Sequence, residues 1–231
     1  HETDVTISVL PDAQVRVNRT VLLFTPDSWN RPQEVLIRAI DDDLDEDQIH
    51  PGAVDHAVSS GDPKYNDVPA GYQTPFTNPS RVDPDPRTVD AQVTDNDLAA
   101  VVITDSSDGS PLVEGTNQQR FYTVRLNSQP RAAVTLSLAT DGQVERQPAT
   151  LAFDAGDWET PKIVTVTTVD DDIVEGLHSG DITHSAASSD GQYNGSAANF
   201  IASSPVTAPQ SRVLRFPIED DDSPGIVFVP D

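Results

Sequence analysis

The sequence predicts an all-β protein made of tandem immunoglobulin-like, seven-stranded antiparallel β-sandwiches. Segments such as 5–9, 121–126 and 163–167 alternate apolar and polar side chains and are rich in β-branched residues, which is the pattern of half-buried strands. Pro, Gly, Asn and Asp separate these segments, and no stretch offers a convincing helical face. Short strands at such spacing favour an antiparallel sandwich.

An internal repeat supports a tandem arrangement. The run Asp41–Glu46 returns 129 residues later as Asp170–Glu175, and Trp29 returns at the same distance as Trp158. Such self-similarity is the signature of a repeat array. We predict a first domain at 1–98 that lacks its opening strands, a complete domain at 99–222, and at 223–231 the first strand of a following repeat or a donor strand.

The complete copy is predicted to contain seven strands, the first of them in two pieces. They are expected at 101–104 with 112–113, and at 120–126, 133–138, 150–153, 162–169, 179–186 and 213–218. A long loop rich in Pro, Ser and Ala is expected between the last two of these strands, at 196–211, and 68–87 is its counterpart in the first copy. Loops of this length are uncommon, so each is expected to be functional or disordered.

Charge restricts the classes of partner. Asp and Glu number 38 against 14 Lys and Arg, which gives a formal charge of −24 and makes nucleic acid or an anionic membrane an unfavourable partner. Cations are the expected counterpart, although an acidic, lysine-poor surface also suits a salt-adapted protein. Cysteine is absent, and no apolar run approaches the roughly 20 residues of a membrane-spanning helix.

Acidic residues are predicted to gather at one end of the complete sandwich, because alternate turns of an antiparallel sheet emerge at the same end. So many carboxylates raise each other's pKa when they crowd together, and a polyvalent cation removes that conflict. Oxygen ligands with no cysteine and no adjacent histidine favour Ca²⁺, and solvated acidic loops are the alternative. The residues at this end are Glu114, Asp141, Asp170, Asp171, Asp172, Glu175, Asp220, Asp221 and Asp222.

Four motifs together resemble the Calx-beta repeat, a family of calcium-binding sandwich domains. They are Val113-Glu114-Gly115 before a strand, Phe-x-x-x-x-Trp-x-x-Pro at 153–161, Val-Asp-Asp-Asp-x-x-Glu at 169–175, and the closing acids at 220–222. The resemblance covers essentially the whole chain. It implies calcium ligands at Glu114, Asp141, Asp170, Asp171, Glu175, Asp220 and Asp222.

In the first copy the same resemblance implies a less complete site. The opening Glu is missing together with its strands, and Asn96 stands where the second copy has the middle acid of its closing run. We therefore expect fewer or weaker ions there. The implied ligands are Asp12, Asp41, Asp42, Glu46, Asp95 and Asp97, with Asp43 beside them in the acidic run.

Several other residues are candidates for a site. His50 and His56 recur as His178 and His184, which allows a transition-metal site, although polar residues on a strand surface are the simpler interpretation. The two tryptophans are expected at core corners. Asn18 and Asn194 begin glycosylation sequons, and glycans are a possible partner. No catalytic motif is found, so the segment is predicted not to be an enzyme.

These observations predict a non-enzymatic, calcium-binding structural or adhesive repeat segment of a large extracellular surface or filament protein, in which Ca²⁺ stiffens domains and joints. Neighbouring repeats of the same or another molecule are the expected partners, including a head-to-tail arrangement in which a terminal strand at 226–229 completes another molecule's sheet. A calcium-sensing module of a transporter or enzyme and a carbohydrate-binding adhesin module are the alternatives.

Overall fold

The computed structural model describes residues 3–65, 87–195, 198–204 and 212–225, and they form two compact units. The first unit comprises residues 1–42 and 46–96, and the second comprises residues 43–45 and 97–231. The described residues are nearly all in strands, turns and loops, with a single 3-10 turn at Gly191–Tyr193. They contain no helix long and apolar enough to cross a membrane.

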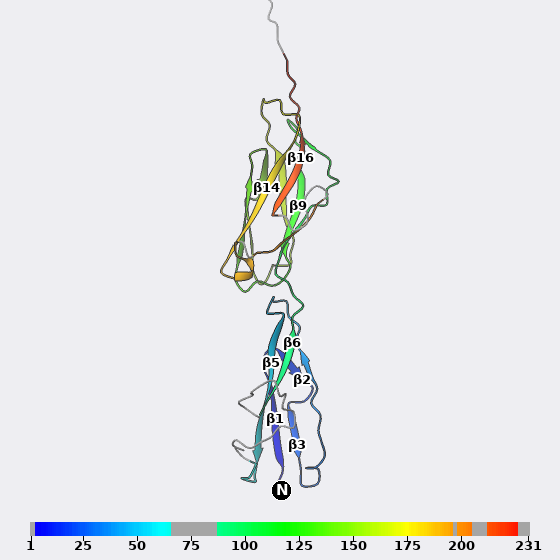
Figure 1. Cartoon of the computed structure of the whole chain (residues 1–231), viewed down its shortest axis with the longest axis vertical. Helices are drawn as coiled ribbons and strands as arrows, with labels where there is room; N and C mark the ends of the chain where they lie inside the picture. The colour runs from blue at the N-terminus through cyan, green and yellow to red at the C-terminus, as the bar shows by residue number, and fades with distance from the viewer. Residues whose placement is uncertain (1–2, 66–86, 196–197, 205–211, 226–231) are drawn as a thin grey trace, which may run out of the picture. The chain divides into compact units, whose positions relative to one another are not determined.

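The described residues of the first unit form one four-stranded sheet in the order β3-β1-β5-β6 and a two-stranded sheet, β2-β4 (Figure 1). All of its pairings are antiparallel. Val9, Val15 and Val54 are almost fully buried between these strands. The strands are β1 (Val5–Pro11), β2 (Val15–Val17), β3 (Val21–Phe24), β4 (Ile37–Ala39), β5 (Ile49–Ser60) and β6 (Thr88–Thr94).

In the second unit the residues that the structure describes form two five-stranded sheets, in the orders β12-β10-β14-β16-β8 and β11-β13-β9-β7-β15. Pairing is antiparallel except at β8 with β16 and β15 with β7, which run parallel. Its strands are β7 (Val101–Thr104), β8 (Leu112–Val113), β9 (Arg120–Leu126), β10 (Val134–Thr140), β11 (Val144–Gln147), β12 (Thr150–Phe153), β13 (Lys162–Thr168), β14 (Leu177–Ser188), β15 (Phe200–Ser203) and β16 (Val213–Glu219).

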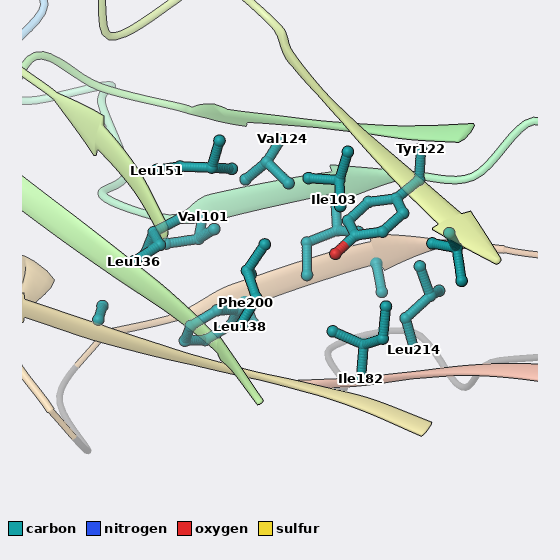
Figure 2. Packing of buried hydrophobic residues seen from close by; sticks show 14 of the residues in the cluster. Val101, Ile103, Tyr122, Val124, Leu136, Leu138, Leu151, Ile182, Phe200 and Leu214 are labelled. Atoms are coloured by element: carbon teal, nitrogen blue, oxygen red, sulfur yellow. The ribbon is translucent and has the colours of Figure 1, made fainter. Parts of the chain in front are cut away.

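A single hydrophobic core fills the space between these two sheets. Figure 2 shows Ile103, Tyr122 and Val124 on one side of it and Ile182 and Leu214 on the other. Along β9, β10 and β14, buried residues alternate with more exposed ones, as expected of strands that present one face to a core. The period-two pattern in the sequence is therefore the direct cause of the sandwich-like packing.

The all-β prediction is confirmed, but the described part of the second unit has ten strands instead of seven. The predicted strands at 101–104, 120–126 and 150–153 coincide with β7, β9 and β12. The difference arises because the first strand is divided into β7 and β8, and because β11 and β15 were not predicted. β15 lies inside the segment 196–211 that was predicted to be a loop, where it pairs with β7.

The same strand register occurs in both units. In the first unit Val9 on β1 is paired with His56 on β5, and in the second Leu138 on β10 is paired with His184 on β14. A glycine on the longest strand of each unit, β5 or β14, lies against a valine of a neighbouring strand. An added Cβ at Gly52 would lie 2.7 Å from Val15 Cγ1, and one at Gly180 would lie 2.5 Å from Val144 Cγ1.

Two interpretations of individual side chains were wrong. His184 does not lie on a strand surface: it is 1% exposed, donates from Nδ1 to the Arg212 carbonyl at 2.9 Å and accepts the Tyr122 hydroxyl at Nε2 at 3.0 Å. Trp158 packs against the core as expected, but Trp29 is 60% exposed. Trp158 lies against β9, and the described residues of the first unit include no strand in the place of β9.

Three predicted features fall wholly or mainly outside the described residues. They are the long loop at 68–87, of which only Arg87 is described, the terminal strand at 226–229, and the greater part of the loop at 196–211.

Candidate metal centre

The candidate site lies where three loops of the second unit meet, and we call this place the acidic end. One loop follows β8 and carries Glu114, one joins β13 to β14 and carries the acids at 170–175, and one follows β16 and carries the acids at 220–222. β8 pairs with β16, and β14 pairs with β16 on its other side. Strand pairing alone therefore brings the three loops together.

Glu114 is held in place by its backbone. Its N–H donates to the Glu219 carbonyl at 3.0 Å, which extends the β8–β16 pairing by one residue. Gly115 then adopts a left-handed conformation with φ of +63°, and a Cβ at this position would lie 2.4 Å from Asp221 Oδ2. Only glycine leaves room for the Asp221 carboxylate to approach the backbone at position 115 so closely.

The Glu114 side chain is fully buried, at 0% exposed. Neither of its carboxylate oxygens has a hydrogen-bond partner. Burial raises the pKa of Glu114, the nearby His178 lowers it, and Asp220, Asp171 and Glu175 raise it further by charge repulsion. Buried polar groups are nearly always satisfied in folded proteins, so the unpartnered carboxylate at the meeting point of three acidic loops is a candidate ligand for a cation.

Asp220 has a different environment because it is satisfied by backbone amides. Its Oδ2 accepts from the N–H groups of Glu175 at 2.6 Å and Gly176 at 2.8 Å, and its Oδ1 accepts from Asp222 N–H at 2.8 Å. The Gly176 and Asp222 hydrogen bonds are the main reasons why the pKa of Asp220 lies below its usual value. Asp220 therefore stays ionised and fastens the 170–176 loop to the end of β16.

Two groups of potential ligand atoms converge on Glu114. The first consists of Glu114, Asp220 and Asp221, and the second consists of Glu114, Glu175 and His178. Within each group the ligand atoms lie within 4.8 Å of one another. Glu114 belongs to both groups, so it is the central residue of the candidate site.

Other predicted acids of this copy either add negative charge near Glu114 or form hydrogen bonds that hold the turns in place. Asp222 has a buried, unpartnered Oδ2, and its pKa is raised by burial and then by the charges of Asp220, Asp221, Asp172 and Asp170. Asp141 accepts from Gln143 N–H at 3.1 Å and Asp181 N–H at 2.8 Å. Asp141 thus fixes the β10–β11 turn against β14.

The first unit repeats the supporting hydrogen bonds. Asp12 accepts from Gln14 N–H at 2.9 Å and Ala53 N–H at 2.7 Å, as Asp141 does in the second unit. Asp95 accepts from Glu46 N–H at 2.8 Å, as Asp220 does from Glu175. Within the described part of the first unit, however, no three potential ligands come together as they do around Glu114. The predicted ligands Asp41, Asp42, Asp43 and Asp97 lie in the loops after β4 and β6.

Sequence reasoning missed the position of His178. The structure places His178 Nε2 3.4 Å from Glu114 Oε1 and 3.4 Å from Glu175 Oε2. His50 lies beside Glu46 in the first unit in the same way, at 3.2 Å. The signal was present in the sequence as a histidine that follows the acidic run at nearly the same distance in both copies.

The predicted glycosylation residues are both exposed and both make local hydrogen bonds. Asn18 Oδ1 accepts from Leu36 N–H at 2.8 Å, and Asn194 Oδ1 accepts from Ser188 N–H at 3.4 Å.

Comparison with known proteins identifies no family. No family model matches the chain, and no curated protein sequence matches it. Among solved structures, the D0-D1 domain of intimin is 13% identical over 92% of this chain and 80% of that chain, with a TM-score of 0.30. The native conformation of E. coli alpha-2-macroglobulin is 8% identical over 87% of this chain and 10% of that chain, with a TM-score of 0.29. Both scores are too low to carry an argument about function.

Proposed function

We propose that this chain is a non-enzymatic, calcium-binding repeat segment of a large extracellular surface or filament protein. In this proposal Ca²⁺ bound at the acidic end stiffens the sandwich and its joint with the next domain. The observation that carries the proposal is the carboxylate of Glu114, which is fully buried, has no hydrogen-bond partner and is surrounded by other acids.

A bound cation resolves an electrostatic conflict at the acidic end. Removing an unpaired carboxylate from water costs several kcal/mol, and neighbouring carboxylates increase that cost by repulsion. No Lys or Arg forms an ion pair with Glu114 among the described residues, and the side chain recorded beside its carboxylate is His178, with Nε2 3.4 Å from Oε1. A divalent cation supplies the charge that these side chains lack.

The donor set fits Ca²⁺. Glu114, Asp220 and Asp221 offer carboxylate oxygens, and Ca²⁺ takes six to eight oxygen ligands in flexible geometry, whereas Mg²⁺ requires a stricter octahedron. These three residues would hold the ion, which would supply positive charge and would cross-link the loops after β8 and β16. Because the ligands come from distant parts of the sequence, binding stabilises the folded state by mass action.

We further propose that the two units are copies of one immunoglobulin-like repeat. The paired registers, the close glycine contacts and the aspartate–amide hydrogen bonds that recur in both units support this. In each copy an aspartate fixes one turn and another fastens the acidic loop. The first copy has no counterpart of Glu114 within its described residues, so its site binds fewer or weaker ions.

The exposed Trp29 favours carbohydrate binding as a second candidate function. An indole that is 60% exposed offers an apolar face on which a sugar ring can stack. Glycan-array binding that is lost in Trp29→Ala, with Trp158 intact, would support this candidate. Absence of binding by the wild-type chain would remove it.

Calorimetric titration with Ca²⁺ tests the leading proposal. We expect the wild-type chain to bind Ca²⁺ and Glu114→Gln to lose at least one ion, because an amide cannot supply the charge of the carboxylate. Glu145→Gln is the matched control, because Glu145 is an exposed residue of β11 and its replacement changes the net charge equally. Unchanged binding by Glu114→Gln would contradict the proposal.

A further inference from the structure

The protonation of His178 can be deduced from its neighbours. Its Nδ1 lies 3.0 Å from the Gly176 carbonyl oxygen, and a carbonyl can only accept, so Nδ1 carries a hydrogen. In a neutral imidazole the other nitrogen, Nε2, then holds a lone pair. This lone pair faces Glu114 Oε1 and Glu175 Oε2, each at 3.4 Å.

The lone pair of His178 Nε2 therefore faces carboxylate oxygens of two residues at the acidic end. His178 Nε2 and both oxygens of Glu114 are buried and have no hydrogen-bond partner. This arrangement is repulsive unless a positive charge lies between the atoms, either a proton on Nε2 or a metal ion. A histidine whose second ring nitrogen is fixed by a backbone carbonyl is the usual form of a metal-ligating histidine.

We propose that Glu114, Glu175 and His178 form a second cation site that takes a divalent transition-metal ion such as Zn²⁺. Imidazole nitrogen is a ligand that Zn²⁺ accepts readily and that the oxygen-selective Ca²⁺ does not prefer. Three protein ligands leave a further position for water. The inference rests on the proposed cation-binding role of the acidic end, because Glu114 belongs to both ligand groups.

The first unit provides an internal control. His50 Nε2 lies 3.2 Å from Glu46 Oε2 and 3.1 Å from Gln14 Oε1. Among the described residues no third ligand joins His50 and Glu46. The amide of Gln14 can instead donate to Glu46 through Nε2, at 3.3 Å. We therefore assign the transition-metal site to the second unit.

Calorimetric titration of the whole chain with Zn²⁺, in the presence of saturating Ca²⁺, tests this assignment. We expect a Zn²⁺ site in the wild-type chain and at least a tenfold loss of Zn²⁺ affinity in His178→Gln. Replacing even a residue that only hydrogen-bonds to a metal ligand lowers metal affinity roughly tenfold. His50→Gln should bind Zn²⁺ as the wild-type chain does. Equal Zn²⁺ affinity in wild type and His178→Gln, or no Zn²⁺ binding by the wild type, would overturn the proposal.

Nitrogen NMR of the imidazole rings gives a second readout. We expect Zn²⁺ to shift Nε2 of His178 to the position of a metal-bound nitrogen while Nδ1 keeps its hydrogen. An Nε2 that stays protonated in Zn²⁺ would show that the site holds an imidazolium.

The two proposals fail in distinguishable ways. His178→Gln should keep its Ca²⁺ binding, whereas Glu114→Gln should lose both ions. Ca²⁺ binding without Zn²⁺ binding would remove this inference alone. Zn²⁺ binding without Ca²⁺ binding would remove the calcium function alone.

Discussion

Glu114 is the residue on which the stability of the metal-free chain should depend most clearly. Burial raises its pKa in the folded state, whereas the unfolded chain has the ordinary value. Below the unfolded pKa both states are protonated and the penalty is absent. As pH rises through the folded pKa, the folded state must ionise a buried carboxylate and loses stability.

We therefore expect Glu114→Gln to unfold at a higher temperature than wild type in chelator at pH 7, with the difference shrinking as pH falls toward 4. Thermal unfolding followed by circular dichroism measures this, with Glu145→Gln as the control for net charge. A lower midpoint for Glu114→Gln at pH 7 would show that the buried carboxylate is stabilised by a contact other than a metal ion.

His184 should make stability sensitive to mild acid. Burial lowers its pKa to about 4 in the folded state, against about 6.5 in the unfolded chain. At pH 7 both states are neutral. Between pH 6.5 and 4 only the unfolded chain takes up the proton, so the free energy of unfolding falls by about 3 kcal/mol and then levels off.

Urea unfolding at a series of pH values isolates this contribution when wild type is compared with His184→Gln. Glutamine does not titrate, so the variant should lose less stability between pH 7 and 4, although it is less stable at pH 7. The carboxylates that titrate in the same range are common to both proteins and cancel in the comparison. Parallel curves would show that His184 is accessible to protons in the folded state.

For individual residues, sequence patterns predicted which side chains form the candidate site better than they predicted the burial and neighbours of those side chains. The acidic residues around Glu114 were predicted, but the burial of that one carboxylate depends on the parallel pairing of β8 with β16, between residues about a hundred positions apart. His178 and His184 both have a histidine counterpart in the first copy. His178 nevertheless lies beside acids, whereas His184 is hydrogen-bonded to a tyrosine. Trp29 and Trp158 share one motif and differ because only Trp158 has β9 to pack against.

Among the elements, the crossing of β14 over β11 depends on a missing side chain. A Cβ on Gly180 would lie 2.5 Å from Val144 Cγ1 and 3.2 Å from Ile218 Cδ1. We expect Gly180→Ala to cost about 1–3 kcal/mol by overpacking. Val144→Ala in the same chain should restore part of that loss, with a coupling of at least about 0.5 kcal/mol.

Denaturant unfolding of the two single variants and the double variant measures this coupling. Gly191→Ala is the control, because a Cβ at that position would meet nothing within 4 Å. In the first unit, Gly52→Ala combined with Val15→Ala should show the same coupling. Additive effects in either pair would mean that the strands shift apart to admit the extra methyl group.

The correctly predicted strands are those in which apolar and polar residues alternate clearly in the sequence. β9 and β13 alternate apolar and polar residues through most of their length, so their bounds followed from periodicity. β11 contains one buried apolar residue among polar ones, and β15 is short and lies in a loop rich in Ser and Ala. β15 is a strand because β7 offers it a free edge, and pairing of that kind is decided by tertiary structure.

At the level of the whole molecule, we propose that the chain consists of repeats whose acidic loops need cations to fold tightly. The recurrence of Asp12 as Asp141 and of Asp95 as Asp220, with the same backbone partners, indicates that loop geometry is kept in both units. In the second unit Asp220 holds the loop that carries Glu175, and both residues belong to ligand groups that include Glu114. Under the proposed function, the free energy of cation binding would add to the stability of the fold.

Differential scanning calorimetry of the whole chain, in excess chelator and then in millimolar Ca²⁺, tests whether the acidic loops bind calcium. Mg²⁺ and NaCl at matched ionic strength are the controls. We predict a large rise in the unfolding midpoint that is specific to Ca²⁺ and is reduced in Glu114→Gln. An equal rise with NaCl would contradict the account and would show that the carboxylates form a salt-adapted surface instead of a cation site.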